Sequence, residues 1–194
     1  MELAAVRNLE TKARASQGLD VLRQRLEALG ASHQWTCEQV DTFFRTPHGR
    51  LKLREIRTHE ALLRAELIPY LRPDTPGVRE SQFVVLPVTR PDLTLDVFGQ
   101  LLGVAATVIK TRELWLLHDG QVRVHLDQVA GLGDFVEVEA VVETENPAPG
   151  GDDTLQAFRQ QQGERVRDLL EYLGVDEEDL VSVAYVDLLT ANDS

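Results

Sequence analysis

The sequence has little cysteine, few aromatic residues and no long apolar run, and these scarcities exclude several classes of protein. Cys37 is the only cysteine among 194 residues, so no intrachain disulfide can form and a reducing compartment is expected. No apolar run approaches the roughly 20 residues that a membrane-spanning helix needs. The opening residues, MELAAVRNLETK, lack the basic region and apolar stretch of a signal peptide. We therefore expect a cytoplasmic protein without a membrane partner.

Positive charge is also scarce. The chain has 20 Lys and Arg against 32 Asp and Glu, which gives a net charge of −12 at pH 7. This balance argues against a general binder of nucleic acid or of anionic membranes, although a local basic site is still allowed. Hydrophobic residues make up 43% and charged residues 27%, as in globular proteins, and the length suffices for one well-packed domain.

The most informative stretch is Gln121–Glu139, which is typical of two strands around a glycine turn. Side chains in a strand alternate between faces, so Arg123, His125 and Asp127 share one face. Glu137 and Glu139 share a face after the turn. Many half-exposed strands have one apolar and one charged face, and a single such strand would decide nothing.

The same alternation recurs in other segments. Charged faces are expected in the strands Val6–Arg14, Arg50–Arg57, Ala61–Tyr70 and Ala105–Leu117. Their members are Glu10, Lys12, Arg14, Arg50, Lys52, Arg54, Arg64, Glu66, Lys110 and Arg112. The segments His33–Arg45 and Gln82–Val88 are also predicted to be extended. Helical spacing and caps predict helices at Gln17–Leu29, Asp92–Leu102, Thr154–Leu173 and Asp176–Leu189. Arg72–Ser81 is predicted to be a lid or substrate-contact loop, and Glu143–Asp153 an acidic loop.

Two folds explain charged strand faces. An open sheet could turn them to water, but arginine dominates the charges and a few carboxylates match them, which favours an enclosed ligand site. We therefore predict a mainly β (α+β) fold, a closed eight-stranded antiparallel barrel with a polar interior and amphipathic helices packed outside. The chain is predicted to form a single domain over residues 1–194, with barrel strands roughly at 6–142 and C-terminal helices roughly at 154–190.

A barrel interior lined by charged side chains implies a charged ligand. Buried charges are costly unless they are paired, and a polyanion with divalent cations pairs both signs at once. Basic groups would bind phosphate oxygens, and carboxylates would bind hard cations such as Mg²⁺ or Mn²⁺. A small molecule that carries a triphosphate is the expected ligand.

Several segments resemble a known family. They are NLETKAR, GRLKLRE, YLRPD, VIKTRELW, VRVHLD, GLGDFVEVE and YVDLL. Together they resemble the CYTH superfamily, the triphosphate tunnel metalloenzymes, which include class IV adenylyl cyclases and thiamine triphosphatases; the match is closest to the cyclase-like branch. The family's Glu-x-Glu-x-Lys motif reads Asn8-Leu9-Glu10-Thr11-Lys12 here, so Asn8 replaces the first Glu. An amide oxygen can bind a cation without carrying charge, and a weaker metal site is expected.

The resemblance also implies roles for single residues. Metal ligation is expected of Glu10, Asp127, Glu137 and Glu139. Triphosphate binding is expected of Lys12, Arg50, Lys52, Arg54, Lys110, Arg112 and Arg123, and the alternation of Ala61–Tyr70 adds Arg64. Catalytic roles are expected of Lys12, Lys52 and Asp127.

Three functions fit these residues. The first is a metal-dependent triphosphatase that acts on inorganic, thiamine or nucleoside triphosphate. The second is a class IV adenylyl cyclase, in which the ribose 3′-hydroxyl of ATP attacks the α-phosphate and expels pyrophosphate. The third is a binder of polyphosphate or nucleotide without catalysis, which the replacement by Asn8 motivates. The family resemblance is also compatible with a homodimer.

Overall fold

The computed structural model describes residues 6–58, 60–71, 79–143 and 152–192, without the side chains of residues 6–8, 79–82, 141–143, 152–159 and 192. These residues form an antiparallel sheet and four α-helices, so the fold is mainly β as expected. The strands are β1 (Val6–Arg14), β2 (Ser32–Phe44), β3 (Arg50–Arg57), β4 (Leu62–Leu71), β5 (Arg79–Phe83), β6 (Leu86–Val88), β7 (Val104–Leu117), β8 (Val122–Val129) and β9 (Gly133–Glu143). The helices are α1 (Leu19–Ala28), α2 (Pro91–Leu102), α3 (Asp152–Tyr172) and α4 (Tyr185–Asn192).

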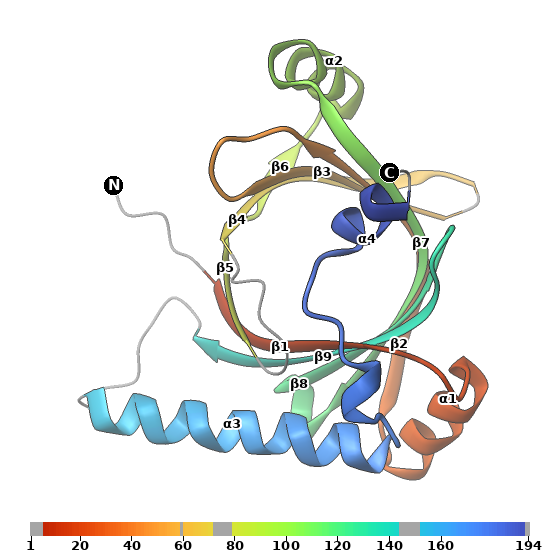
Figure 1. The fold of residues 1–194 in the computed structure, drawn as a ribbon, viewed down its shortest axis with the longest axis vertical. Coiled ribbons are helices and arrows are strands. Elements are labelled where there is room, and N and C mark those ends of the chain that lie inside the picture. The colour runs from red at the N-terminus through yellow and green to blue at the C-terminus, as the bar shows by residue number, and fades with distance from the viewer. Residues whose placement is uncertain (1–5, 59, 72–78, 144–151, 193–194) are drawn as a thin grey trace.

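The sheet curves around a central space (Figure 1). Its strands follow in the order β3, β2, β7, β8, β9, β1, β5 and β4, and β3 also pairs with β4. β5 and β6 pair with β4 in one continuous register, from Leu71↔Gln82 to Ala65↔Val88. The single strand predicted at Gln82–Val88 is thus two segments, interrupted at Val84 and Val85. That the barrel is fully closed stays a prediction.

The register of the sheet brings the predicted charged faces together. Directly opposite residues of paired strands share a face. Lys12 lies opposite Glu137 and Glu10 opposite Glu139, where β1 pairs with β9. The charged residues that were predicted on separate strands therefore lie on the same, inner face of the sheet.

The outer face of the sheet is apolar, and α1 and α3 cover part of it. Val124, Val136 and Val138 are fully buried in one core cluster. The helical residues of this cluster are Leu19, Leu22 and Leu26 of α1 and Val166 and Leu170 of α3. Each such apolar side chain stabilises the fold by roughly 1.5–3 kcal/mol. The expectation that amphipathic helices pack outside the sheet is confirmed for α1 and α3.

The C-terminal segment departs from the prediction. One helix was expected at Asp176–Leu189, but a 3₁₀ turn at Glu177–Asp179 is followed by extended chain and then α4. The backbone N–H of Val181 donates to the carbonyl oxygen of Lys12 at 2.8 Å, so it bonds to β1 instead of continuing a helix.

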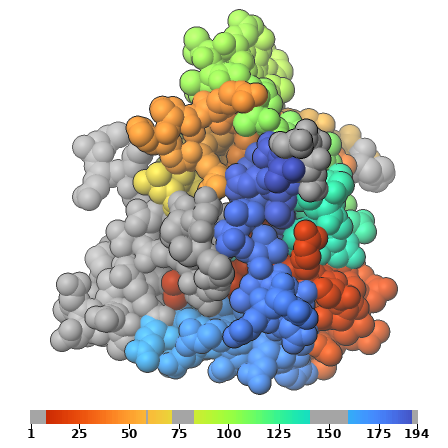
Figure 2. All heavy atoms as spheres, viewed as in Figure 1, coloured from red at the N-terminus to blue at the C-terminus, as the bar shows by residue number. Residues whose placement is uncertain are grey.

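α4 also lies on the other side of the sheet from α1 and α3. Its residues Tyr185 and Val186 pack against Phe135 and Val108. Phe135 alternates in register with Glu137, so it belongs to the charged face. Figure 1 shows the ring of strands from its open end. In the same view, Figure 2 shows the C-terminal segment, in blue, running across the front of the molecule. Packing outside the sheet is therefore wrong for α4.

The remaining predicted segments agree with the structure in part. Residues 72–78 of the predicted loop Arg72–Ser81 lie outside the described residues, and Arg79–Ser81 belong to β5. Residues 144–151 of the predicted acidic loop Glu143–Asp153 also lie outside them. Within the described ranges, no helix combines the length and the apolar character that crossing a membrane demands.

Candidate functional site

The charged face surrounds a cavity of about 150 Å³. Strands from both halves of the chain and the start of α4 contribute its walls. The charged lining residues are Glu10, Lys12, Asp41, Lys52, Arg54, Glu66, Lys110, Arg112, Glu137 and Glu139. Phe43, Tyr70, Phe83 and Tyr185 add aromatic surface. The cavity therefore combines a mainly basic wall with a group of carboxylates.

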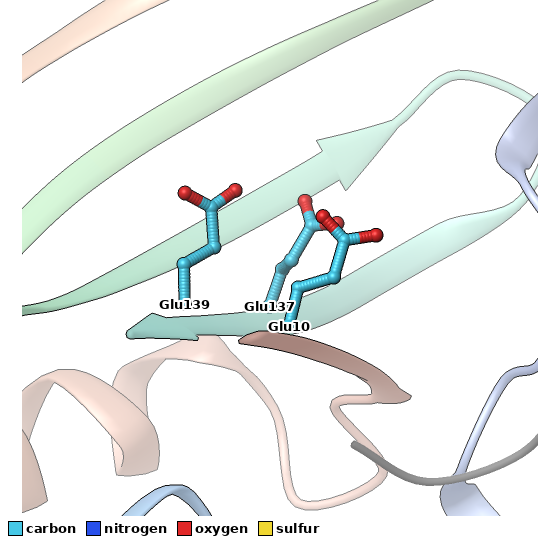
Figure 3. Close-up of side chains that lie close together, drawn as sticks. All are labelled: Glu10, Glu137 and Glu139. Carbon is cyan, nitrogen blue, oxygen red and sulfur yellow. The ribbon is translucent and has the colours of Figure 1, made fainter. Parts of the chain in front are cut away.

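Glu10, Glu137 and Glu139 form this carboxylate group. One carboxylate oxygen from each lies within 4.8 Å of the others. Glu10 comes from β1 and the two others from β9, and all three point to the same side of the sheet (Figure 3). Glu10 is 8% exposed and Glu137 7%, so like charges are crowded where water screens them little.

Neighbouring cations keep Glu137 and Glu139 ionised. Burial alone would raise the pKa of Glu137, but Lys12 and then Arg112 hold it well below its usual value. Lys12 Nζ lies 3.6 Å from Glu137 Oε1, and Arg112 Nη2 lies 2.5 Å from Glu137 Oε2. Burial likewise opposes ionisation of Glu139, but His125, 3.5 Å away, lowers the pKa of Glu139.

The carboxylate group fits a divalent cation. Three carboxylate oxygen donors from adjacent strands converge, and hard cations such as Mg²⁺ and Mn²⁺ prefer such donors. A cation bound there would offset the repulsion between the glutamates. The side chain of Asn8, which would stand next to this group in the strand pattern, lies outside the described side chains.

Two buried aspartates organise the basic wall. Asp41 binds Lys52 and Arg54, with Lys52 Nζ 3.1 Å and Arg54 Nε 2.8 Å from its oxygens. Burial, reinforced by Arg54, lowers the pKa of Lys52 to about 7. A lysine with this pKa gains or loses its proton near neutral pH, depending on its ligands.

Asp127 binds the second pair of cations, Lys110 and Arg112. Lys110 Nζ lies 3.0 Å from Asp127 Oδ2, and Arg112 Nε lies 2.6 Å from Oδ1. The hydroxyl of Tyr185 donates to the same carboxylate at 2.9 Å. Burial and Arg112 lower the pKa of Lys110 to about 8.

Most of the predicted site residues meet at the cavity. Those that line it are Glu10, Lys12, Lys52, Arg54, Lys110, Arg112, Glu137 and Glu139. Asp127 is fully buried, and it does not belong to the group formed by the three glutamates. Asp127 is thus a counter-ion of Lys110 and Arg112, and Arg112 joins it to Glu137 of the carboxylate group.

Four predicted cations lie away from the lining of the cavity among the described residues. Arg50 pairs with Asp187 of α4 at 2.8 Å, and the side chain of Arg64 is 60% exposed. Arg123 is half-buried on β8, opposite Glu139. Arg14 is exposed at the end of β1, where it lies 5.2 Å from the ring of Phe135.

Asp41 is the site residue that the sequence patterns missed. The segment around it was predicted to be extended, and alternation puts Asp41 on the same face as Gln39 and Phe43. Asp41 is a single acidic residue on a strand face that has no regular charged pattern, so alternation did not identify it as a site residue. Its role emerges only from the pairing of β2 with β3, which sets Asp41 opposite Arg54.

A curved antiparallel sheet around a cavity lined by basic side chains and clustered carboxylates is the arrangement expected of a protein that holds a polyanion with a hard cation. The chain belongs to the CYTH domain family, whose sequence profile matches residues 7–173. The family resemblance inferred from the sequence motifs is confirmed. No curated protein sequence matches the chain.

Solved structures share the fold at low sequence identity. PH1012 from Pyrococcus horikoshii is 23% identical with a TM-score of 0.72, covering 93% of this chain and 98% of its own. A candidate adenylate cyclase from Vibrio parahaemolyticus is 18% identical with a TM-score of 0.69, covering 98% and 99%. HpAC1 from Hippeastrum, a candidate adenylyl cyclase described as having a dominant triphosphatase activity, is 13% identical with a TM-score of 0.58, covering 96% of both chains.

Proposed function

We propose that this protein is a divalent-metal-dependent triphosphatase that acts on inorganic, thiamine or nucleoside triphosphate, as one CYTH unit in the cytoplasm. The observation that carries the proposal is that the carboxylate group and the basic wall line the same cavity. A triphosphate with a bound Mg²⁺ or Mn²⁺ supplies the opposite charge to each part. Membership of the CYTH family supports this reading.

The side chains of the cavity have separate tasks in this proposal. Lys12, Lys52, Arg54, Lys110 and Arg112 bind phosphate oxygens and stabilise the charge that develops as the phosphoryl group is transferred. A cation at Glu10, Glu137 and Glu139 supplies Lewis-acid chemistry at the same place.

Two of the predicted catalytic residues act by position in this proposal. Lys12 lies 3.6 Å from Glu137, so it can contact a phosphate group that approaches the carboxylates. Asp127 keeps Lys110 and Arg112 aimed at the ligand. Arg50, Arg64 and Arg123 are given no phosphate contact, because they do not line the cavity.

A class IV adenylyl cyclase is the second candidate. The same basic wall would serve it, and the aromatic surface of Phe43, Tyr70 and Phe83 offers a place for a nucleobase. The candidate cyclase from Vibrio parahaemolyticus shares the fold. The third candidate, a binder without catalysis, is motivated by Asn8.

A panel of turnover assays separates the three candidates. Inorganic triphosphate, thiamine triphosphate and ATP are each incubated with Mg²⁺, Mn²⁺ or EDTA, and phosphate and cyclic AMP are both measured. Metal-dependent phosphate release supports the triphosphatase, and cyclic AMP with pyrophosphate supports the cyclase. Binding of triphosphate without any turnover supports the third candidate.

Two variants test the carboxylate group within this panel. Replacing both Glu137→Gln and Glu139→Gln is expected to abolish metal-dependent turnover, and turnover that persists would remove the metal site from the proposal. Asn8→Glu restores the family motif and is expected to lower the Mg²⁺ concentration needed for half-maximal activity.

A further inference from the structure

Two buried aspartates in the cavity wall hold matching sets of cations. Each aspartate binds a lysine and an arginine that stand two residues apart on a neighbouring strand. One set is Asp41 with Lys52 and Arg54, and the other is Asp127 with Lys110 and Arg112.

The two sets share their geometry. Arg54 lies directly opposite Asp41 in the pairing of β2 with β3, as Arg112 lies opposite Asp127 between β7 and β8. In both sets the arginine donates to the two carboxylate oxygens through Nε and Nη2. The lysine donates to Oδ2 in both, at 3.1 Å from Lys52 and 3.0 Å from Lys110.

The sets differ in their further contacts. Arg112 continues to Glu137, so the Asp127 set is joined to the carboxylate group. Asp41 instead accepts hydrogen bonds from Gln39 Nε2, at 3.2 Å to each oxygen. Asp41 is only 4% exposed, and its four donor groups occupy both of its oxygens.

An acidic residue in the wall of an anion site needs an explanation. Its charge repels a polyanion, so Asp41 weakens binding if it does nothing else. However, lysine and arginine side chains lose much rotamer freedom when a ligand orders them, and an anchored guanidinium has less to lose. Burial opposes ionisation of Asp41, but Arg54 and Lys52 hold the pKa of Asp41 well below its usual value. The anchor therefore stays charged at neutral pH.

We propose that Asp41 is a positioning residue for triphosphate binding, which fixes Lys52 Nζ and the guanidinium of Arg54 in the orientation that receives phosphate groups. The inference rests on the proposed function, because it presumes that the cavity binds triphosphate. Asp41 itself makes no contact with the ligand in this arrangement. It acts through Lys52 and Arg54, which are the basic side chains that β3 contributes to the cavity wall.

Charge and position predict opposite results for one substitution. Asp41→Asn removes a negative charge from an anion site, so a purely electrostatic role predicts tighter binding of triphosphate. A positioning role predicts weaker binding, because Lys52 and Arg54 lose the anchor that aligns them. The sign of the change therefore separates the two roles.

The experiment is titration calorimetry of inorganic triphosphate with the purified protein in EDTA, where no turnover occurs. Asp41→Asn is expected to weaken binding about tenfold, as the loss of a charged hydrogen-bond network predicts. In a background that carries Lys52→Gln and Arg54→Gln, the same substitution is expected to cause no further weakening. Unchanged or tighter binding in the single variant would overturn the inference, as would equal weakening in both backgrounds.

Further variants separate positioning from folding. Asp41→Glu keeps the charge but displaces the carboxylate, so it is also expected to weaken binding, and wild-type affinity there would count against positioning. Glu38→Gln removes an exposed charge from the same strand and is expected to bind as wild type. If the wild-type protein neither binds triphosphate in EDTA nor turns it over with Mg²⁺, the proposed function fails and the inference with it. If the wild type binds and both Asp41 variants match it, only the inference fails.

Discussion

Arg112 Nη2 and Glu137 Oε2 lie 2.5 Å apart, and this ion pair joins the basic wall of the cavity to its carboxylate group. The same guanidinium also binds both oxygens of Asp127. A single planar side chain thus fixes the distance between the groups proposed to hold phosphate and those proposed to hold a cation.

Arg112→Lys is expected to lower kcat for triphosphate about 100-fold with a smaller change in KM. A lysine keeps the charge but cannot bind Asp127 through two donors and reach Glu137 as well. Steady-state kinetics with Mg²⁺ measure the effect. Arg23→Lys is the matched control, because Arg23 binds Glu113 through two donors outside the cavity. A kcat within a few-fold of wild type for Arg112→Lys would contradict the assigned role.

Arg54→Ala and Lys110→Ala are each expected to weaken triphosphate binding about tenfold or more, because each removes a charged donor from the cavity wall. Arg64→Ala should leave the affinity unchanged, since that side chain is 60% exposed and lies outside the lining. Calorimetry in EDTA gives the affinities, and thermal melting shows whether the variants are folded. Equal losses in all three variants would mean that only overall charge matters.

Triphosphate affinity is expected to fall as the pH rises through about 7 to 8. Burial and neighbouring arginines lower the pKa of Lys52 to about 7 and that of Lys110 to about 8. Below these values both ammonium groups are charged, and above them they are neutral. The ligand-free fold should behave in the opposite way: between these values and about 10.4 the unfolded chain binds more protons, so stability rises with pH there.

Lys52→Arg provides the control for this pH dependence. A guanidinium stays charged across the range, so the variant should lose affinity less steeply than wild type. Calorimetry in EDTA between about pH 6 and pH 9 covers both lysines. Parallel affinity curves for the two proteins would show that Lys52 does not titrate in this range.

Gln162→Met is expected to raise the free energy of unfolding by about 1 kcal/mol. Gln162 of α3 is fully buried, and neither its Oε1 nor its Nε2 has a hydrogen-bond partner among the described residues. Methionine has a similar shape and removes two unpaired polar atoms. Denaturant unfolding measures the change. The neighbouring Gln161 is exposed, so Gln161→Met should change stability by less than about 0.5 kcal/mol.

Strand alternation predicted the face of most charged residues but not their position relative to the cavity. Lys12 and Arg14 share a face of β1, and only Lys12 lies at the cavity. Arg54 and Arg64 are separated in the same way, one lining the cavity and the other exposed. A period of two contains no information on how strands are staggered, and this stagger decides which charges meet.

The ion-pair partner of each charged residue also could not be predicted from the sequence. The family resemblance grouped Asp127 with the glutamates, and only the pairing of β7 with β8 shows that it lies opposite Arg112. Asp41 was missed for the same reason. The chain before α4 bonds to β1 through the backbone N–H of Val181 and the carbonyl oxygen of Lys12, and no local pattern indicates this contact.

The pairing of β1 with β5 and β9 has a consequence for the order of events during synthesis. β1 leaves the ribosome before its two neighbours, and β9 is the last of the described strands to be made. Until then β1 has two unpaired edges, which invite association with other chains. Glu10 and Lys12 on its inward face make that edge a poor template for an apolar strand. The residues proposed to serve catalysis in the finished protein would therefore also protect the nascent chain from aggregation.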